Sequence, residues 1–318
     1  ASDVFSSSLQ ETNALVLYNY LPRRWDFGGG LFHFKNYYSS RVTTLGDALG
    51  SPRLFSERNF GALVNASYPF DRFRRMELNF TQLFAEIRFF DPLFGTPLER
   101  KFQSVSSPSV SLVGDNALYG YFGPANGHRY NLTYSPSLPV FPNGLSYHTV
   151  TADIRHYWDL THGYTFAVRG LGGYSAGLDP RTFFVGGYST LRGFDDFSLE
   201  GRRVAIGNVE FRFPFIQQLG LVGPVPLGVF NLRGAVFADF GAVWDAGDQV
   251  QLSVISRAEN DPLSAPTPRG VFKGGAFSYG AGIRTAIYFF ILKVDAAWNT
   301  DFRTSSTPRW HFSVGPEF

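Results

Sequence analysis

The stretch from Phe183 to Phe194 has residue types that could do chemistry. It reads Phe-Phe-Val-Gly-Gly-Tyr-Ser-Thr-Leu-Arg-Gly-Phe, and Arg192 is its one charged residue. A guanidinium can form charge-assisted, bidentate hydrogen bonds with carboxylates. Gly193 lets the chain turn without a Cβ clash. The stretch can also be an ordinary surface loop, so its chemistry depends on which partners the surrounding elements bring to Arg192.

Two short motifs match enzyme signatures. Gly173-Tyr174-Ser175-Ala176-Gly177 has the G-x-S-x-G pattern of a nucleophile elbow, which requires a strand, a sharp turn and then a helix. Here it follows a strand-like segment and enters a connection with Gly and Pro, which favours a simple turn. Asp239-Phe240-Gly241 matches the kinase D-F-G triplet, but the other kinase motifs are missing. We therefore expect no catalytic residue, although a membrane-embedded hydrolase remains an alternative.

The six histidines show no metal-ligand spacing. They are His33, His128, His148, His156, His162 and His311. No pair has the short helical spacing of zinc sites, and histidines on the same strand are too far apart to chelate one ion. Ordinary wall or interface histidines are the favoured interpretation, and the sequence predicts no metal, cofactor or nucleotide.

The segments around the Arg192 stretch alternate with a period of two. Apolar residues alternate with charged or small ones, which is typical of strands with one apolar face. The apolar positions include Val150, Ile154, Val209, Phe211, Phe213, Val236, Phe240, Tyr279, Ile283, Val294, Trp298, Trp310, Phe312 and Val314. The opposite positions include Asp153, Arg155, Asn208, Glu210, Arg212, Arg233, Asp239, Ser278, Arg284, Lys293, Asp295 and His311. Glu210 and Asp239 thus lie on polar faces.

Composition indicates that the apolar faces meet lipid. Aromatic residues form 17% of the chain, and 34 of its 318 residues are Gly. No uninterrupted apolar run reaches the ~18 residues that a membrane helix needs, whereas a lipid-facing strand needs only alternate apolar residues. Aromatic residues also gather near strand ends, as in membrane girdles. Examples are Tyr37, Tyr38, Phe89, Phe90, Tyr157, Trp158, Trp244, Trp298 and Trp310.

Connection lengths support an antiparallel transmembrane β-barrel. Taking the C-terminus as periplasmic, the long connections 39–57, 91–107, 175–202 and 245–274 fall on one side. Short turns at 21–26, 69–73, 159–162 and 287–289 fall on the other, although the inner connection 215–227 is long and the outer loop 136–144 is short. We count about fourteen strands, the first a weak one near residues 3–10. The Pro- and Ser-rich stretches near 104–109 and 262–268 are assigned to loops. Residues 1–318 form one expected domain.

The Arg192 motif resembles a family signature. Gly186-Gly187 followed by Leu191-Arg192-Gly193-Phe194 is similar to the sixth outer loop of the BamA/TamA superfamily of outer-membrane assembly and translocation barrels. The segments Val209–Pro214 and Phe237–Asp245 resemble the two following strands of that family, which carry inward-facing Glu and Asp. The resemblance implies that the loop folds into the barrel, where Arg192, Gly193 and Phe194 meet Glu210 and Asp239. It also implies that Phe318 is a C-terminal assembly signal.

The resemblance implies a function in inserting or translocating proteins, or lipids, at the outer membrane of a Gram-negative-type bacterium. Expected partners are outer-membrane lipids, client proteins and partner subunits. Nucleic acid is not expected, because the formal net charge is only +2 with no basic face. Arg192 can act as a static strut or take part in gating, and both readings remain open.

Two departures keep other functions open. The family barrel has sixteen strands, so the first strands and any soluble N-terminal module are expected to lie outside this chain. The chain opens Ala1-Ser2-Asp3 without a signal peptide, as a mature protein or a piece of a longer one would. A passive porin-like channel and the membrane-anchor component of a larger complex are the alternatives.

Overall fold

The computed structural model describes residues 12–21, 24–41, 52–90, 97–120, 122–160, 163–221, 227–245, 251–252, 274–287 and 290–315. Every regular element in these ranges is a β-strand, so the all-β prediction is confirmed. The described residues contain no helix long and apolar enough to cross a membrane.

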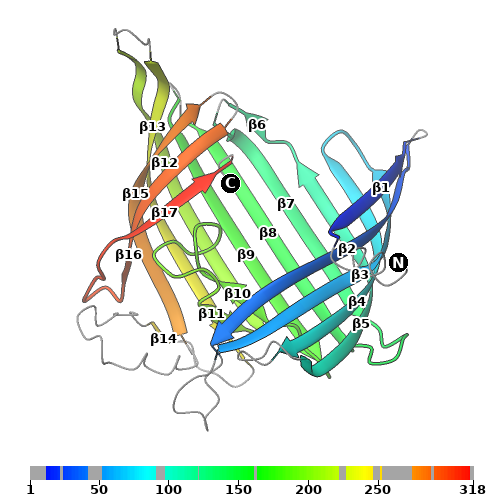
Figure 1. Cartoon of the computed structure of the whole chain (residues 1–318). Coiled ribbons are helices and arrows are strands. Elements are labelled where there is room, and N and C mark those ends of the chain that lie inside the picture. Colours follow the sequence, from blue (N-terminus) through cyan, green and yellow to red (C-terminus); the bar gives the residue numbers. More distant parts are fainter. Residues whose placement is uncertain are drawn as a thin grey trace. The chain divides into compact units, whose positions relative to one another are not determined.

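Most strands belong to one large sheet (Figure 1). Its order is β1-β2-β3-β4-β5-β7-β8-β9-β12-β13-β15-β16-β17, with β14 paired to β15 and β6 to β7. The strands of the first half are β1 (Ala14–Tyr20), β2 (Asp26–Arg41), β3 (Pro52–Pro69), β4 (Arg74–Phe90), β5 (Pro97–Asp115), β6 (Leu118–Tyr119), β7 (Pro124–Ser137) and β8 (Tyr147–Asp159). The others are β9 (Thr165–Gly177), β12 (Arg203–Leu221), β13 (Leu227–Trp244), β14 (Gln251–Leu252), β15 (Gly274–Ile287), β16 (Phe290–Thr300) and β17 (Arg309–Val314). Two short strands, β10 (Phe183–Val185) and β11 (Leu199–Gly201), form a separate hairpin.

Thirteen strands lie on this path in the described part of the chain. The sequence predicted about fourteen, of which the first, near residues 3–10, lies outside the described residues. Consecutive long strands pair antiparallel, as in β12 with β13 and β15 with β16. The antiparallel sheet required by the predicted fold class is therefore present.

Contacts divide the chain into two compact units. Unit 1 holds residues 1–112, 133–149 and 176–180, and unit 2 holds residues 113–132, 150–175 and 181–318. Whether residues 1–318 fold as one domain stays a prediction.

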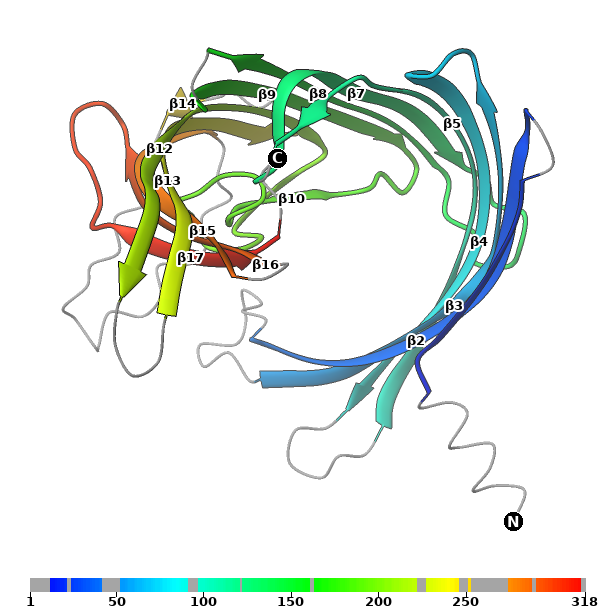
Figure 2. The same cartoon turned by 90° about the horizontal axis from the view of Figure 1, so that it is seen from above.

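The strands of unit 2 have the predicted two faces. On β12 and β13, Val209, Val236 and Phe240 are exposed, whereas Glu210 and Asp239 on the alternate positions are buried. A soluble sheet would bury the apolar side, so this reversed pattern fits a wall with lipid on its apolar face. The motif loop, which we define as residues 181–202, lies on the opposite, inward-curving side of these strands (Figure 2).

Three predicted connections are shorter than expected because strands continue into them. The bounds predicted for the connection at 215–227 are wrong, since β12 and β13 stay paired as far as Leu221 and Leu227. Pro214 lies at a register shift between these strands, where a missing N–H is tolerated, so β12 continues past it. The loops predicted at 39–57 and 91–107 are likewise cut short by β3 and β5.

The Ser-rich stretch 104–109 lies inside β5 and not in a loop. Its hydroxyl groups bond sideways across the sheet: Ser106 donates to Gln82 at 2.6 Å, and Ser107 shares a 2.8 Å bond with Ser135. Cross-strand hydrogen bonds of this kind stabilise polar strands that sequence patterns assign to loops. The stretch 262–268 lies outside the described residues.

The aromatic girdle assignment is partly wrong. Trp158 and Trp310 are exposed near strand ends, as expected, whereas Tyr37 is exposed within β2, four residues from its end. Tyr157 is fully buried on the polar face instead, 6.0 Å from the Arg212 guanidinium. Its position beside Trp158 placed it in the girdle by count, but neighbouring strand residues point to opposite faces.

Candidate functional site

The motif loop begins and ends in the β10–β11 hairpin. Phe183 pairs with Gly201 and Val185 with Leu199. Between the two strands of this hairpin, Leu191 and Phe194 are buried in an apolar cluster with residues of β12, β13 and β15. The other members of this cluster are Val185, Leu199, Val204, Ile206, Val243 and Ala276. Apolar contacts therefore hold the loop against the sheet in addition to its charged contacts.

Glycines shape the tip of the loop. Gly186, Gly187 and Gly193 all have positive φ, at 129°, 85° and 85°. These conformations are poorly accessible to residues with a Cβ. At Gly193 a Cβ would also lie 3.2 Å from the Ser278 Cβ on β15. Gly193 thus permits both the turn that aims Arg192 and the close approach of the tip to the sheet.

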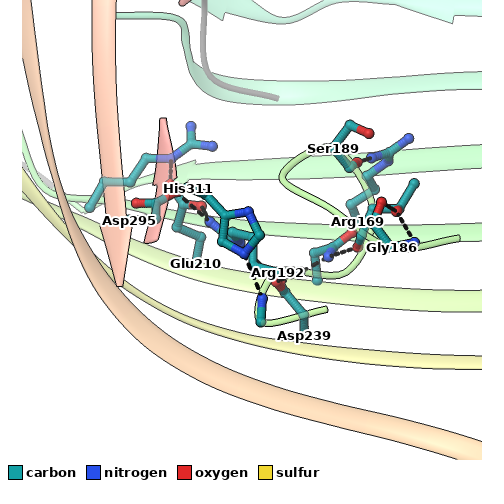
Figure 3. A network of polar contacts seen from close by, with 12 residues as sticks. Arg169, Gly186, Ser189, Arg192, Glu210, Asp239, Asp295 and His311 are labelled. Atoms are coloured by element: carbon teal, nitrogen blue, oxygen red, sulfur yellow. Dashed lines mark hydrogen bonds and ion pairs between the residues drawn. The ribbon is translucent and has the colours of Figure 1, made fainter. Parts of the chain in front are cut away.

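Arg192 is buried between two carboxylates (Figure 3). Its Nε and Nη2 donate to the two oxygens of Asp239, each at 2.8 Å. Its Nη1 donates to Glu210 Oε2 at 2.9 Å, and its backbone N–H reaches Asp239 Oδ2 at 3.2 Å. The guanidinium carbon also lies 3.4 Å from the centre of the Phe237 ring, in a cation–π contact. The structure thus brings together Arg192, Glu210 and Asp239.

Further ions complete what we call the Arg192 network: Arg192, Arg212, Arg284, Glu210, Asp239 and Asp295. Glu210 Oε1 accepts from Arg212 Nε at 3.0 Å and lies 3.5 Å from Arg284 Nη2. Asp295 pairs with Arg284 and lies 3.6 Å from Arg192 Nη1. Each member is at most 5% exposed. Three cations meet three anions, so these ions neutralise each other inside the protein.

The last two strands hold the peptide of Gly193. Its N–H donates to His311 Nε2 on β17 at 2.9 Å, and its carbonyl accepts from Asn299 Nδ2 on β16 at 3.1 Å. Asp195, two residues on, pairs with Arg309 of β17. The alternation places His311 on the polar face, but the sequence predicts no more than an ordinary wall histidine there. The partner here is a backbone N–H, which carries no sequence signal.

A second contact holds the other side of the loop. Arg169 on β9 donates to the Ser189 carbonyl at 2.8 Å. The same guanidinium bonds both oxygens of Asp153 on β8, at 3.1 and 2.8 Å, and Asp153 also pairs with Arg155. Asn208 adds a bond to the Thr190 carbonyl at 2.9 Å. The alternation places Asp153 and Asn208 on the polar face, but it does not predict the bonds that Arg169 and Asn208 make to the loop.

The residues of the enzyme-like motifs have other surroundings. Ser175 lies within β9, and its Oγ accepts from the Arg181 backbone N–H at 2.8 Å. No helix follows it in the described segment 163–221. Asp239 of the D-F-G triplet accepts a hydrogen bond from the Arg192 guanidinium. In the part of the chain that the structure describes, no group of three or more His, Cys, Asp and Glu side chains could hold a metal ion.

Phe318, the predicted C-terminal signal, lies outside the described residues.

Comparisons with known proteins identify the family of the chain. A family model described as the Omp85 superfamily domain matches residues 9–318. A curated relative, outer envelope protein 80, chloroplastic, of Oryza sativa subsp. japonica, is 25% identical over 230 residues. That match covers 70% of this chain but only 30% of the relative's length.

Solved structures share the fold. BamA from Haemophilus ducreyi lacking POTRA domains 1-3 matches with a TM-score of 0.59 at 16% identity, over 96% of this chain and 70% of that one. CdiB from Acinetobacter baumannii matches with a TM-score of 0.58 at 16% identity, over 95% and 49%. At these identities the likeness shows the fold.

Proposed function

The chain belongs to the Omp85 superfamily of outer-membrane β-barrel proteins, and on that premise we propose that it inserts or translocates protein substrates at this membrane. In this proposal the motif loop is docked on the inner wall by the Arg192 network, and no catalytic step takes place. The substrates are unfolded outer-membrane or secreted polypeptides.

One observation carries the proposal: the tip of the loop bonds to the last strand as well as to the central wall. Arg192 bonds β12 and β13, while Gly193 bonds β16 and β17. A simple plug needs no bond to β17. A barrel that opens beside its last strand would need one, because movement of β17 would then reach the loop directly.

The test uses the full-length protein reconstituted in phosphatidylcholine vesicles. An unfolded eight-stranded outer-membrane protein is added from urea, and its folding is followed by protection from protease. We expect faster folding than in empty vesicles, and loss of that acceleration in Arg192→Ala. Arg181→Ala is the matched control, since this exposed arginine lies in the same loop outside the network.

A different result would favour the porin alternative. Steady, ion-selective conductance in a planar bilayer, with no effect on client folding, would refute the proposal. Equal acceleration by the wild type and the Arg192→Ala variant would separate the function from the loop.

A crosslink distinguishes a strut from a gate. These 318 residues contain no cysteine, so Asp195→Cys with Arg309→Cys can be joined by a short bis-maleimide at their contact. Full activity after crosslinking indicates a static strut. Loss of activity with a retained fold indicates that the loop and β17 must separate.

A further inference from the structure

A second group of ions lies in unit 1, and its positive and negative charges do not cancel. We define the Glu86 cluster as Arg58, Glu86, Arg88 and Arg100. The carboxylate of Glu86 is 2% exposed, and it lies 2.8 Å from Arg100 Nε and 3.6 Å from Arg58 Nη1, and bonds Arg88. Three guanidinium groups thus surround one carboxylate, which leaves a charge of +2. Arg88 and Arg100 remain 38% and 64% exposed.

The cluster lies on the apolar face of its strands. Arg58 is paired in register with Glu86 and with Lys35, and the next same-face row is His33, Phe60 and Phe84. Rows further along the same face contain Leu31, Val64, Phe80, Leu78 and Phe27, all of them exposed. The order on this face is therefore apolar, then aromatic, then charged.

The aromatic row is a girdle of four phenylalanines. Phe84 lies 5.5 Å from Phe60, 6.0 Å from Phe102 and 5.4 Å from Phe141, measured between ring centres. Arg58 covers the outer side of this group, 4.9 Å from the Phe60 ring centre. Aromatic side chains of this kind mark the boundary between hydrocarbon and headgroups in outer-membrane barrels.

A second girdle marks the other boundary. Trp25, Tyr68 and Phe70 form it, with ring centres 4.9 and 5.8 Å apart. Eight residues of β3 separate Phe60 from Tyr68, which is about 27 Å along a strand at ~3.4 Å per residue. A tilt of ~40° reduces this to about 20 Å of depth, close to the ~25 Å apolar band of such barrels. Arg58, beyond Phe60, therefore lies at the level of lipid headgroups.

We propose that the Glu86 cluster binds a phosphate group of an anionic lipid headgroup. Guanidinium groups match phosphate through paired, charge-assisted hydrogen bonds. Glu86 holds the three arginines in place, so less side-chain entropy is lost when a phosphate binds. The excess charge and the exposure of Arg88 and Arg100 leave donors that face the membrane boundary. The occupant is a lipid because the cluster borders the aromatic girdle on the lipid-facing side.

The test measures lipid selectivity of the full chain in phosphatidylcholine vesicles. Spin-labelled phosphatidic acid and spin-labelled phosphatidylcholine are compared by electron paramagnetic resonance, which reports the fraction of each lipid held at the protein. We expect phosphatidic acid to be favoured, and the preference to fall about fivefold for each arginine neutralised, as for basic residues at an anionic surface. The main variant is Arg88→Gln with Arg100→Gln.

Matched variants make the result specific. Arg75→Gln removes an arginine of similar exposure at the opposite end of β4, where it pairs with Glu77 at 2.6 Å, and it should leave the preference unchanged. Arg88→Lys with Arg100→Lys keeps the charge without the forked donors, and we expect an intermediate preference. Arg100→Gln alone serves if the double variant does not fold, since Arg100 is the most exposed of the three.

Three outcomes would overturn the proposal. One is an unchanged preference in the Arg88 and Arg100 variants, and another is an equal loss in Arg75→Gln. The third is loss of the preference in millimolar inorganic phosphate at constant ionic strength, which would assign the site to free phosphate. The readout is lipid association rather than client folding, so its failure does not bear on the proposed insertion activity.

Discussion

The Arg192 network and the Glu86 cluster use the same two chemical groups to opposite effect. In the network, three arginines meet three carboxylates, all buried, and the charges cancel. In the cluster, three arginines share one buried carboxylate, and two of them, Arg88 and Arg100, are 38% and 64% exposed. A balanced, buried set can only hold the protein's own parts together. An unbalanced, exposed set keeps binding capacity for an outside anion.

The largest expected effect tests whether the network is balanced. Arg192→Ala removes the guanidinium from Asp239, which is fully buried, and leaves it the backbone N–H of residue 192 and the Asn208 side chain, which donates to Asp239 Oδ1 at 2.9 Å. Removing one partner of a buried ion pair costs about 3–5 kcal/mol. We expect the motif loop to lose protection from hydrogen exchange and from protease, and heat stability to fall. Normal loop protection would refute the balance argument, and Arg181→Ala provides the baseline.

A double variant sharpens the same point. If the cost of Arg192→Ala arises from the stranded carboxylate, Asp239→Asn in the same chain should recover part of it. We expect a coupling energy of roughly 1–3 kcal/mol in the double-mutant cycle. The free energies of unfolding of the two single variants and the double variant measure it. Strict additivity would mean that Arg192 and Asp239 act independently.

The bond to the last strand should matter less than the ions. His311→Leu removes the acceptor for the Gly193 N–H, and an unpaired buried donor costs about 1–3 kcal/mol. Since this site is only partly buried, we expect the lower end of that range. Hydrogen exchange at Gly193 is the direct measurement. His311→Gln, whose side-chain oxygen can accept, serves as the control and should lose less protection.

The Glu86 cluster should respond weakly in stability. Arg88→Gln leaves Arg58 and Arg100 beside Glu86, and partly exposed ion pairs contribute about 0–1 kcal/mol. We expect thermal unfolding in detergent within that range of the wild type. A loss as large as that of Arg192→Ala would erase the distinction between the two regions.

An exposed turn gives the smallest effect and a pH signature. Asp71 accepts from the Phe73 and Arg74 backbone N–H groups and from the Arg74 side chain. These bonds hold the pKa of Asp71 below its ordinary value. Its stabilising contribution is therefore present above the ordinary Asp pKa and is lost as pH falls through the lowered value. In Asp71→Asn, the unfolding midpoint should lose this small acid-side dependence relative to the wild type.

The sequence predicts part of the Arg192 network and none of the Glu86 cluster. Alternation placed Glu210, Asp239 and Asp295 on one face, and the family resemblance supplied Arg192 as the partner of the first two. Neither the alternation nor the resemblance predicts that Asp295 and Arg284 join the Arg192 network, because the cross-strand register decides which charges meet. The Glu86 cluster escaped altogether, since its members come from three strands and interrupt an apolar face. The loop prediction for residues 104–109 is wrong because the hydroxyl groups of Ser106 and Ser107 bond to neighbouring strands, and these partners are not visible in the sequence.

The bonds of Gly193 have a consequence for the order of folding. They join residues separated by 118 and 106 positions in the chain, so they cannot form before β16 and β17 are in place. Contacts of such long sequence separation are closed late, after the loop entropy between them has been lost. Changes at Arg192 or His311 should therefore speed unfolding far more than they slow folding. Protection of the motif loop from hydrogen exchange is therefore expected only in chains in which β16 and β17 have already paired.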